Sequence, residues 1–370
     1  MATQISPSDG TSLHPYRDPV TRWLLIVAFL VFGMVIVGGF VRLSRAGLSI
    51  VEWDVVTGVI PPIGDAAWEA SFAEYKLTPE YLLVNQGMTL SEYQYIFYLE
   101  WAHRLIARIA GLIVVLPLLW FMVRGVISVR ESLRYWGIAA LFGIQGAIGW
   151  IMVSSGLQDR PTVSHFRLTI HLLAALALLG LTLWMALDRI RDASPANRRP
   201  SPASAAIRIL TWAVLATTVL QIAYGGLVAG LKAGHVSNTW PLMFGYLVPP
   251  NLLSVVDPWW MNLFEPLGSH WVHRWLAFVV TGLAIAMFIL VRRERPTDGA
   301  SVRTTGWLLA ALGVQIGLGV ATVLLNVPKW FALTHQGVGI VVFSVALVAT
   351  HRITATVDDS QPAAASQPAA

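Results

Sequence analysis

The stretch from residue 92 to residue 108 reads EYQYIFYLEWAHRLIAR and runs without a break into the apolar residues 109 to 123. Glu100, His103 and Arg104 lie within four residues of one another, so a helix places them on neighbouring faces. Ionisable groups at the mouth of a membrane span are costly to bury and therefore indicate a functional site. The alternative is a salt-bridged helix end with a hydrogen-bonded histidine. The choice between the two depends on the rest of the chain.

The composition is that of a protein embedded in a membrane. Of the 370 residues, 56% are hydrophobic and 12% are charged, and the mean hydropathy is +0.64. Soluble proteins carry about 25% charged residues, roughly twice this share. Arginines in loops between apolar spans contribute to the net charge of +5, and they encode topology rather than indicate nucleic acid. The chain has no cysteine, which excludes disulfides, cysteine-ligated metals and thiol catalysis.

Eight apolar segments are long enough to cross a hydrocarbon core of ~30 Å. We therefore predict an all-α integral membrane protein whose eight transmembrane helices form two tandem four-helix bundles. The spans are expected at residues 22–42, 95–123, 133–153, 166–187, 206–229, 271–291, 304–325 and 331–350.

A stretch rich in proline, serine and arginine follows the fourth span and divides the chain. The expected parts are a cytoplasmic N-terminal segment (1–21), an N-terminal four-helix half (22–187), a cytoplasmic linker (188–205), a C-terminal four-helix half (206–351) and a disordered cytoplasmic tail (352–370).

The distribution of arginine predicts that both termini are cytoplasmic, because arginines gather on one side of the spans. The two long loops, at about 43–94 and 230–270, then face outward. The spacing of Trp68, Phe72 and Tyr75 predicts a short amphipathic helix in the first loop. Residues 78–80 predict a second helix start, and residues 89–92 form a capping-box pattern that predicts the start of the second span.

The two halves repeat each other in sequence. With four spans each, they have the same orientation, so a pseudo-twofold axis along the membrane normal is expected. The matching pairs are Gly38-Gly39 with Gly225-Gly226, His103-Arg104 with His273-Arg274, Gln145 and Gly149 with Gln315 and Gly319, and His171 with His335.

Four histidines occupy matching places near the outer ends of the even-numbered spans: His103, His171, His273 and His335. Haem iron takes axial ligands from opposite faces of the porphyrin, and histidines on facing helices supply them. Each half is therefore a candidate bis-histidine haem site. One alternative is that these are hydrogen-bonded core histidines. The other is a zinc site, which would usually include cysteine ligands or carboxylates that hydrogen-bond the histidines.

One reactive position differs between the halves. Glu100 stands three residues before His103, and His270 stands three residues before His273. This asymmetry predicts two haems with different tasks.

Three arginines are candidates to bind the anionic propionates of the haems, because arginine binds carboxylates in a bidentate manner. They are Arg104, Arg108 and Arg274. Pairing with Glu100 at a four-residue spacing is an equal alternative for Arg104.

Taken together, these features resemble the heme A synthase family. The resemblance rests on Glu100-x-x-His103-Arg104, on residues 79–80 and 92–97 before it, on the second His-Arg pair, on the two later histidines and on the repeat. It covers nearly the whole chain and points to the cysteine-free branch of proteobacteria and mitochondria.

The resemblance implies an oxidoreductase that converts the C8 methyl group of haem O into a formyl group, giving haem A for cytochrome c oxidase. It implies haem b on His273 and His335, substrate haem O near His103 and His171, and Glu100 in the reaction centre. It also implies a bacterial inner membrane with the haem sites near the periplasmic side. Haem O synthase, cytochrome c oxidase assembly factors and a second copy of the chain stay open as partners.

Two rival functions stay open at this point. A membrane b-type di-haem cytochrome that transfers electrons from quinol needs the same four histidines but has no use for the Glu100/His270 difference. A transporter built from repeats would carry broken helices and paired charges at the midplane of the membrane.

Overall fold

The computed structural model describes residues 15–54, 56–157, 161–193 and 203–354. Within these ranges, eight helices are long and apolar enough to cross a membrane, which confirms the predicted number of spans. They are α1 (Pro19–Leu43), α4 (Leu90–Val123), α5 (Val129–Ser154), α6 (His165–Asp192), α7 (Ala205–Leu231), α8 (Pro266–Glu294), α9 (Gly299–Leu324) and α10 (Lys329–Thr354).

The helices begin where the sequence provides caps. Thr89 and Glu92 form the predicted capping box at the start of α4, in which each side chain bonds the backbone of the other residue. Asp18 accepts a hydrogen bond from the backbone of Thr21 at the start of α1, and Pro19 follows it at a position that needs no N–H donor. Local chemistry thus fixes these helix ends before packing contributes.

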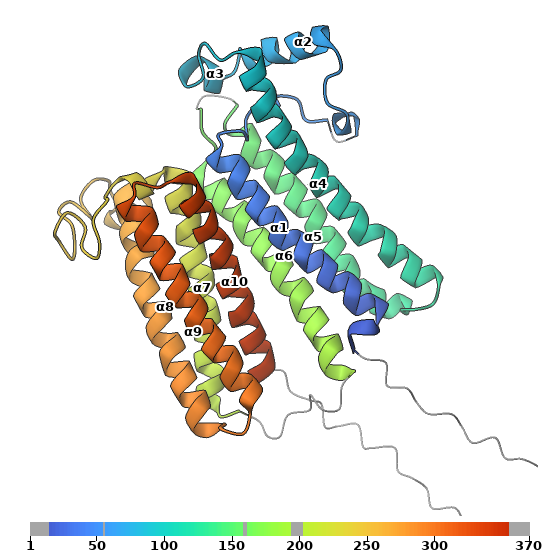
Figure 1. The fold of residues 1–370 in the computed structure, drawn as a ribbon, viewed down its shortest axis with the longest axis vertical. Coiled ribbons are helices and arrows are strands. Elements are labelled where there is room, and N and C mark those ends of the chain that lie inside the picture. Colours follow the sequence, from blue (N-terminus) through green and yellow to red (C-terminus); the bar gives the residue numbers. More distant parts are fainter. Residues whose placement is uncertain (1–14, 55, 158–160, 194–202, 355–370) are drawn as a thin grey trace, which may run out of the picture.

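The helices form two groups of four (Figure 1), and in each group the contacts between neighbours close a ring. In the first half, α1 packs on α4 and α6, and α5 packs on α4 and α6. In the second half, α7 packs on α8 and α10, and α9 packs on α8 and α10. The halves meet along α1, α6, α7 and α10. The neighbours match in the two rings, whereas the pseudo-twofold axis itself stays a prediction.

The described chain begins and ends at the same end of the bundle, and the two long connections, called outer connections after the side predicted for them, lie at the other end (Figure 1). The buried apolar core lies on the side of the chain ends. Its members in the even-numbered spans all follow the histidines along the chain, for example Val114 after His103 and Ile340 after His335. The histidines therefore lie in a separate layer, nearer the outer connections.

The first outer connection covers the N-terminal half. It contains α2 (Asp65–Tyr75) and α3 (Pro79–Leu83), which confirms both predicted short helices. Trp68, Phe72 and Tyr75 are buried and pack against Tyr93 and Phe97 of α4. The second connection holds only the 3-10 turns η4 (Ala233–His235) and η5 (Trp259–Phe264), so the two halves are covered differently.

Several predicted boundaries differ from the observed ones by a few residues, and three of the differences cross an expected border between parts of the chain. Helix α1 begins at Pro19, within the expected N-terminal segment, because Asp18 caps it there. Helix α6 continues to Asp192, into the expected linker, and α10 continues to Thr354, into the expected tail. The rest of the predicted disordered tail, residues 355–370, lies outside the described residues, as do residues 194–202 of the linker.

Candidate functional site

Each of the four histidine rings lies against a glycine on the neighbouring odd-numbered span. A side chain at any of these glycines would press on the ring: a Cβ would lie 2.9–3.3 Å from the nearest ring atom. The four pairs are Gly38 with His103, Gly149 with His171, Gly225 with His273 and Gly319 with His335. The glycines thus allow close approach of two helices at the level of each ring.

The second glycine of each Gly-Gly pair faces the other half of the molecule. Gly39 of α1 lies against Gln336 of α10, whose amide donates to the backbone oxygen of Val35 at 2.7 Å. Gly226 of α7 lies against Thr169 of α6. In each pair, the first glycine therefore contacts a histidine of the same half, and the second glycine contacts a helix of the other half.

The histidine pair of the C-terminal half fits an iron porphyrin. The ring centroids of His273 and His335 are 6.2 Å apart, so the two rings face each other across a short gap. An imidazole nitrogen binds a metal at about 2 Å, so two such bonds and the two rings fill a gap of this size. The second ring nitrogens are 3.1 Å from the backbone oxygens of Gln221 and Gln315.

Histidines that bind metals use their second nitrogen in this way, which fixes the ring and leaves Nε2 for the metal. At His335 the side-chain amide of Gln315 is also 3.3 Å from Nε2, so an iron at this nitrogen would replace that contact. The donor set of the C-terminal half therefore suits a six-coordinate haem.

In the N-terminal half, the Nδ1 atom of His171 is buried and has no hydrogen-bond partner among the described residues. The amide of Gln145 donates to the backbone oxygen of His171 at 2.9 Å. An unpaired buried nitrogen is costly in a finished core, so its presence points to a group that completes this layer.

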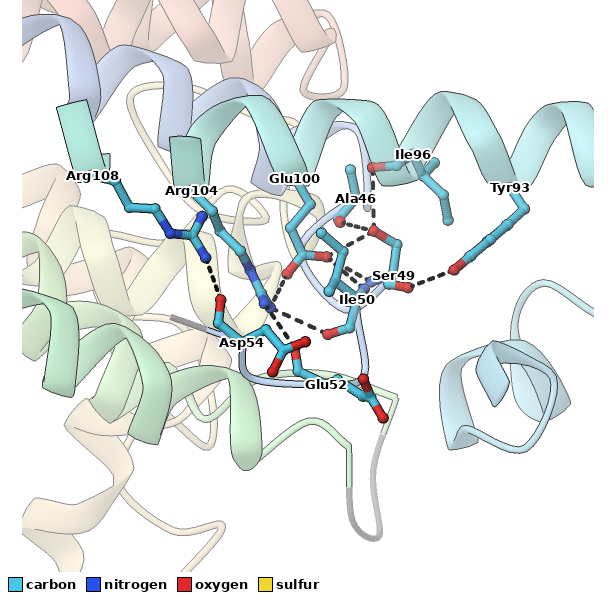
Figure 2. A network of polar contacts seen from close by, with 10 residues as sticks. All are labelled: Ala46, Ser49, Ile50, Glu52, Asp54, Tyr93, Ile96, Glu100, Arg104 and Arg108. Atoms are coloured by element: carbon cyan, nitrogen blue, oxygen red, sulfur yellow. Dashed lines mark hydrogen bonds and ion pairs between the residues drawn. The ribbon is translucent and has the colours of Figure 1, made fainter. Parts of the chain in front are cut away.

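Glu100 is surrounded by hydrogen-bond donors (Figure 2). Its Oε2 accepts from the Ser49 N–H at 2.8 Å, the Ser49 hydroxyl at 2.7 Å and the Ile50 N–H at 3.1 Å. Its Oε1 lies 2.6 Å from Arg104. The carboxylate is 3% exposed, so this cage fixes its position in the absence of solvent.

The two arginines of α4 reach the first outer connection. Arg104 donates to the backbone oxygens of Ile50 at 3.2 Å and Glu52 at 3.3 Å, and its guanidinium stacks over Trp53. Arg108 donates to the backbone oxygen of Asp54 at 2.6 Å (Figure 2). Pairing with Glu100, one of the two roles predicted for Arg104, is therefore present.

The C-terminal half carries a matching but different pair. Arg274 lies 3.3 Å from Nε2 of His270 and donates to the backbone oxygens of Pro241 and Leu242 at 3.1 and 3.0 Å. Both His270 and Arg274 are buried. In each half, then, an arginine ties the predicted reactive side chain to the outer connection, with a carboxylate in one half and an imidazole in the other.

Sequence reasoning missed three residues of this site. Ser49 and Ile50 hold Glu100, and Gln221 holds His273. A signal for Gln221 existed: the pattern Gln-x-x-x-Gly, which ends in the glycine against a histidine, occurs in α5, α7 and α9. No comparable signal marked Ser49 and Ile50, because their contact with Glu100 depends on the path of the loop.

Within the described residues, no three His, Asp or Glu side chains converge as a metal-ion site requires. The chemistry available is therefore that of histidine pairs, arginines and one fixed carboxylate. The pair His273 and His335 can hold a porphyrin, and in the other half a fixed carboxylate lies one helical turn from His103.

Comparison with known proteins assigns this arrangement to a family. The family described as cytochrome oxidase assembly protein matches residues 21–347. A heme A synthase of Rhodopseudomonas palustris (strain HaA2) is 45% identical over 94% of this chain and 94% of its own. Heme A synthases of Bradyrhizobium sp. (strain ORS 278) and Sphingopyxis alaskensis are 42% and 38% identical, over 93% and 95% of this chain and 94% and 96% of their own.

Proposed function

The chain belongs to the heme A synthase family of cytochrome oxidase assembly proteins, and from this premise we propose that it oxidises the C8 methyl group of haem O to the formyl group of haem A. As a family member it is an enzyme of haem biosynthesis whose product serves cytochrome c oxidase. The relatives give no support to an electron-transferring cytochrome or a transporter.

In this proposal the C-terminal half holds a resident haem b on His273 and His335. The supporting observation is the facing ring pair, 6.2 Å between centroids, with both second nitrogens directed at backbone oxygens. When bound, the haem supplies the redox chemistry. The chain's own residues orient it, and Arg274 with His270 forms the polar edge of its site.

The N-terminal half holds the substrate haem O on His103 and His171. Glu100 is the catalytic residue of the proposal, because it is the one carboxylate within a helical turn of a proposed ligand in this half. Its Oε1 and Oε2 atoms are held by Arg104, Ser49 and Ile50, so it can accept a proton released from the methyl group without moving.

Propionate binding is proposed for Arg104, Arg108 and Arg274. Each guanidinium donates to loop carbonyls at the outer end of its span. Arginine has five N–H donors, so these contacts leave others for a carboxylate. These arginines would then hold the haem propionates at the end of the bundle that carries the outer connections.

We further propose that the protein lies in the bacterial inner membrane with both termini in the cytoplasm and the haem sites near the periplasm. A reporter fused after Ala370 should be active in the cytoplasm only. A tag inserted near Asp65 should be accessible from the periplasm. A periplasmic terminus would contradict this orientation.

The proposed activity is tested by purifying the full chain from cells that also make haem O. A reduced-minus-oxidised spectrum identifies low-spin haem, and chromatography identifies the extracted haems. We expect haem B together with haem A. A preparation that holds haem O and haem B and never forms haem A would refute the proposal.

A further inference from the structure

The second outer connection, residues 232–265, presents large apolar side chains and carries almost no charge. Between residues 233 and 264 the sequence has a single aspartate or glutamate, Asp257, and no lysine or arginine. A surface of this kind is rarely left in water. Six large aromatic or aliphatic side chains of this connection are more than half exposed: Phe244, Tyr246, Leu247, Val248, Val255 and Trp259.

The first outer connection has a different surface. Residues 44–89 contain eight charged residues, six of them acidic. Exposed apolar side chains occur there too, but they stand beside charged ones, as Leu77 does beside Lys76. The charge of the first connection suits water, whereas the second connection lacks such groups.

The backbone of the second connection finds polar partners within the connection itself. Asn262 is 1% exposed, and its side-chain oxygen accepts from the N–H groups of Val255 and Val256, both at 2.9 Å. Its amide donates to the backbone oxygens of Val256 at 2.7 Å and Trp259 at 2.9 Å. One asparagine thus makes four hydrogen bonds, which uses both its donors and both its lone pairs. Internal partners of this kind are needed where water is scarce.

The second connection extends to the side of the bundle. In Figure 1 the yellow segment leaves the outer end of the C-terminal half sideways, away from the N-terminal half, whereas α2 and α3 stand at the outer end of α4. The ends of membrane spans mark the surface of the bilayer. A segment that extends sideways at this level meets the headgroup region, where tryptophan and tyrosine are enriched.

We propose that the second outer connection lies in the headgroup region of the outer leaflet and that its exposed aromatic and aliphatic side chains contact lipid. This inference goes beyond the proposed function, because it rests on the spans and on the surface of the connection and not on haem chemistry. A protein partner is favoured less, since protein interfaces have a polar rim and Asp257 is the one acidic or basic residue available for it.

The inner side of the same segment holds the polar edge of the C-terminal site. The indole N–H of Trp271 donates to the backbone oxygen of Leu247 at 2.9 Å. Arg274, one turn further along α8, donates to the backbone oxygens of Pro241 and Leu242. Lipid contact on the outer side therefore fixes the depth of Arg274 in the membrane through the carbonyls that it binds.

The test uses single spin labels, which the absence of cysteine from the chain makes possible. Leu247→Cys and Val255→Cys place a label at the two most exposed of the six positions, 60% and 64%. Glu69→Cys, on the exposed side of α2, is the control for water, and Val279→Cys, half exposed near the middle of α8, is the control for lipid. The full chain is purified from cells that make haem O, labelled and reconstituted in bilayers. Collisions of each label with oxygen, which concentrates in lipid, and with a water-soluble nickel chelate are then measured.

We expect the labels at 247 and 255 to have a ratio of oxygen to nickel collisions between those at 69 and 279, as the headgroup region requires. Labels that meet the chelate as often as the label at 69 would place the connection in water and overturn the proposal. Labels that meet neither reagent would be covered by protein, a partner or a second copy, and would also overturn it. Chromatography of haems from the same samples tests the proposed function separately, so either result can fail without the other.

Discussion

The two halves of the molecule share a framework and differ at the places where chemistry would occur. Both are rings of four helices, and both set histidines against glycines of a neighbouring helix. They differ in the residue three positions before the first histidine, which is Glu100 in one half and His270 in the other. They also differ in the cover above, which is an aromatic cap of two short helices over the first half only. A shared framework that differs at these places fits the proposal that both halves bind a haem and that only the first half acts on it.

The largest expected effect of a single change comes from Glu100→Gln. Removing the proposed proton acceptor should lower the rate of haem A formation by about 10²–10⁴. Haem O or a partly oxidised haem should accumulate, while haem b stays bound in the other half. The measurement is chromatography of haems extracted from purified protein.

This substitution needs a matched control, because four donors point at the carboxylate. A glutamine amide has one acceptor oxygen, so one of these donors loses its partner. Ser49→Ala removes one donor and keeps the carboxylate. It should cost at most about tenfold, the range of one or two hydrogen bonds. Normal haem A production by folded Glu100→Gln protein would show that Glu100 is not the catalytic residue.

An intermediate effect is expected from filling the glycine contacts. In Gly319→Ala the new Cβ would lie 2.9 Å from His335, closer than carbon atoms approach, and the ring must shift. Overpacking of this kind costs about 1–3 kcal/mol, so occupancy of haem b should fall. Gly317→Ala on the same helix, where a Cβ meets nothing within 4 Å, is the control.

The same change in the N-terminal half sharpens the comparison. Gly149→Ala places a Cβ 3.1 Å from His171, and Gly146→Ala, with nothing within 4 Å, is its control. We expect Gly149→Ala to lower the content of haem O and haem A and to spare haem b. If Gly149→Ala instead lost haem b and kept haem O and haem A, the N-terminal half would be the site of haem b and the proposed assignment would be reversed.

The smallest expected effect concerns Glu80 in the cap over the N-terminal half, which has no counterpart in the second half. Burial, and next the charge of Glu100, raise the pKa of Glu80 to about 7 from its ordinary value of 4.5. Arg42, Arg45 and Lys232 act in the opposite direction. The folded state then binds more protons than the unfolded state between about pH 4.5 and 7. Stability therefore falls as the pH rises through this window.

Thermal unfolding in detergent, followed from pH 5 to pH 8, measures this effect. Glu80→Gln should flatten the pH dependence, whereas Glu69→Gln, which removes an exposed carboxylate from the same cap, should leave it unchanged. An equal slope in Glu80→Gln and the unaltered chain would show that Glu80 does not carry the effect.

Most of the framework could be predicted from the sequence, because membranes impose strong constraints. Spans of about 20 apolar residues must form helices, and arginine-rich loops mark their ends. The repeat then placed four histidines at one level, and the helical spacing of Glu100 and Arg104 indicated their ion pair. These features depend on residues close in sequence or on a period that can be counted.

What could not be predicted depends on the paths of the outer loops. Ser49 follows α1 by a few residues, yet it meets Glu100 about fifty positions later through its backbone and its hydroxyl. Every residue except proline has a backbone N–H donor, so the residue types in a sequence do not indicate which of these donors will contact Glu100. The loop brings polar atoms to Glu100 that the apolar composition of the helices does not indicate.

The central claim is that the two halves hold different haems, and the haem content of two ligand variants tests it most directly. Full-length protein is purified from cells that make haem O, and each haem is counted per chain. His335→Ala should lose haem b and keep haem O or haem A. His171→Ala should keep haem b and lose haem O and haem A, because an iron that loses an axial ligand is held less firmly. If both variants lose the same haem, or if both keep an unchanged low-spin spectrum, the division of tasks between the halves is contradicted.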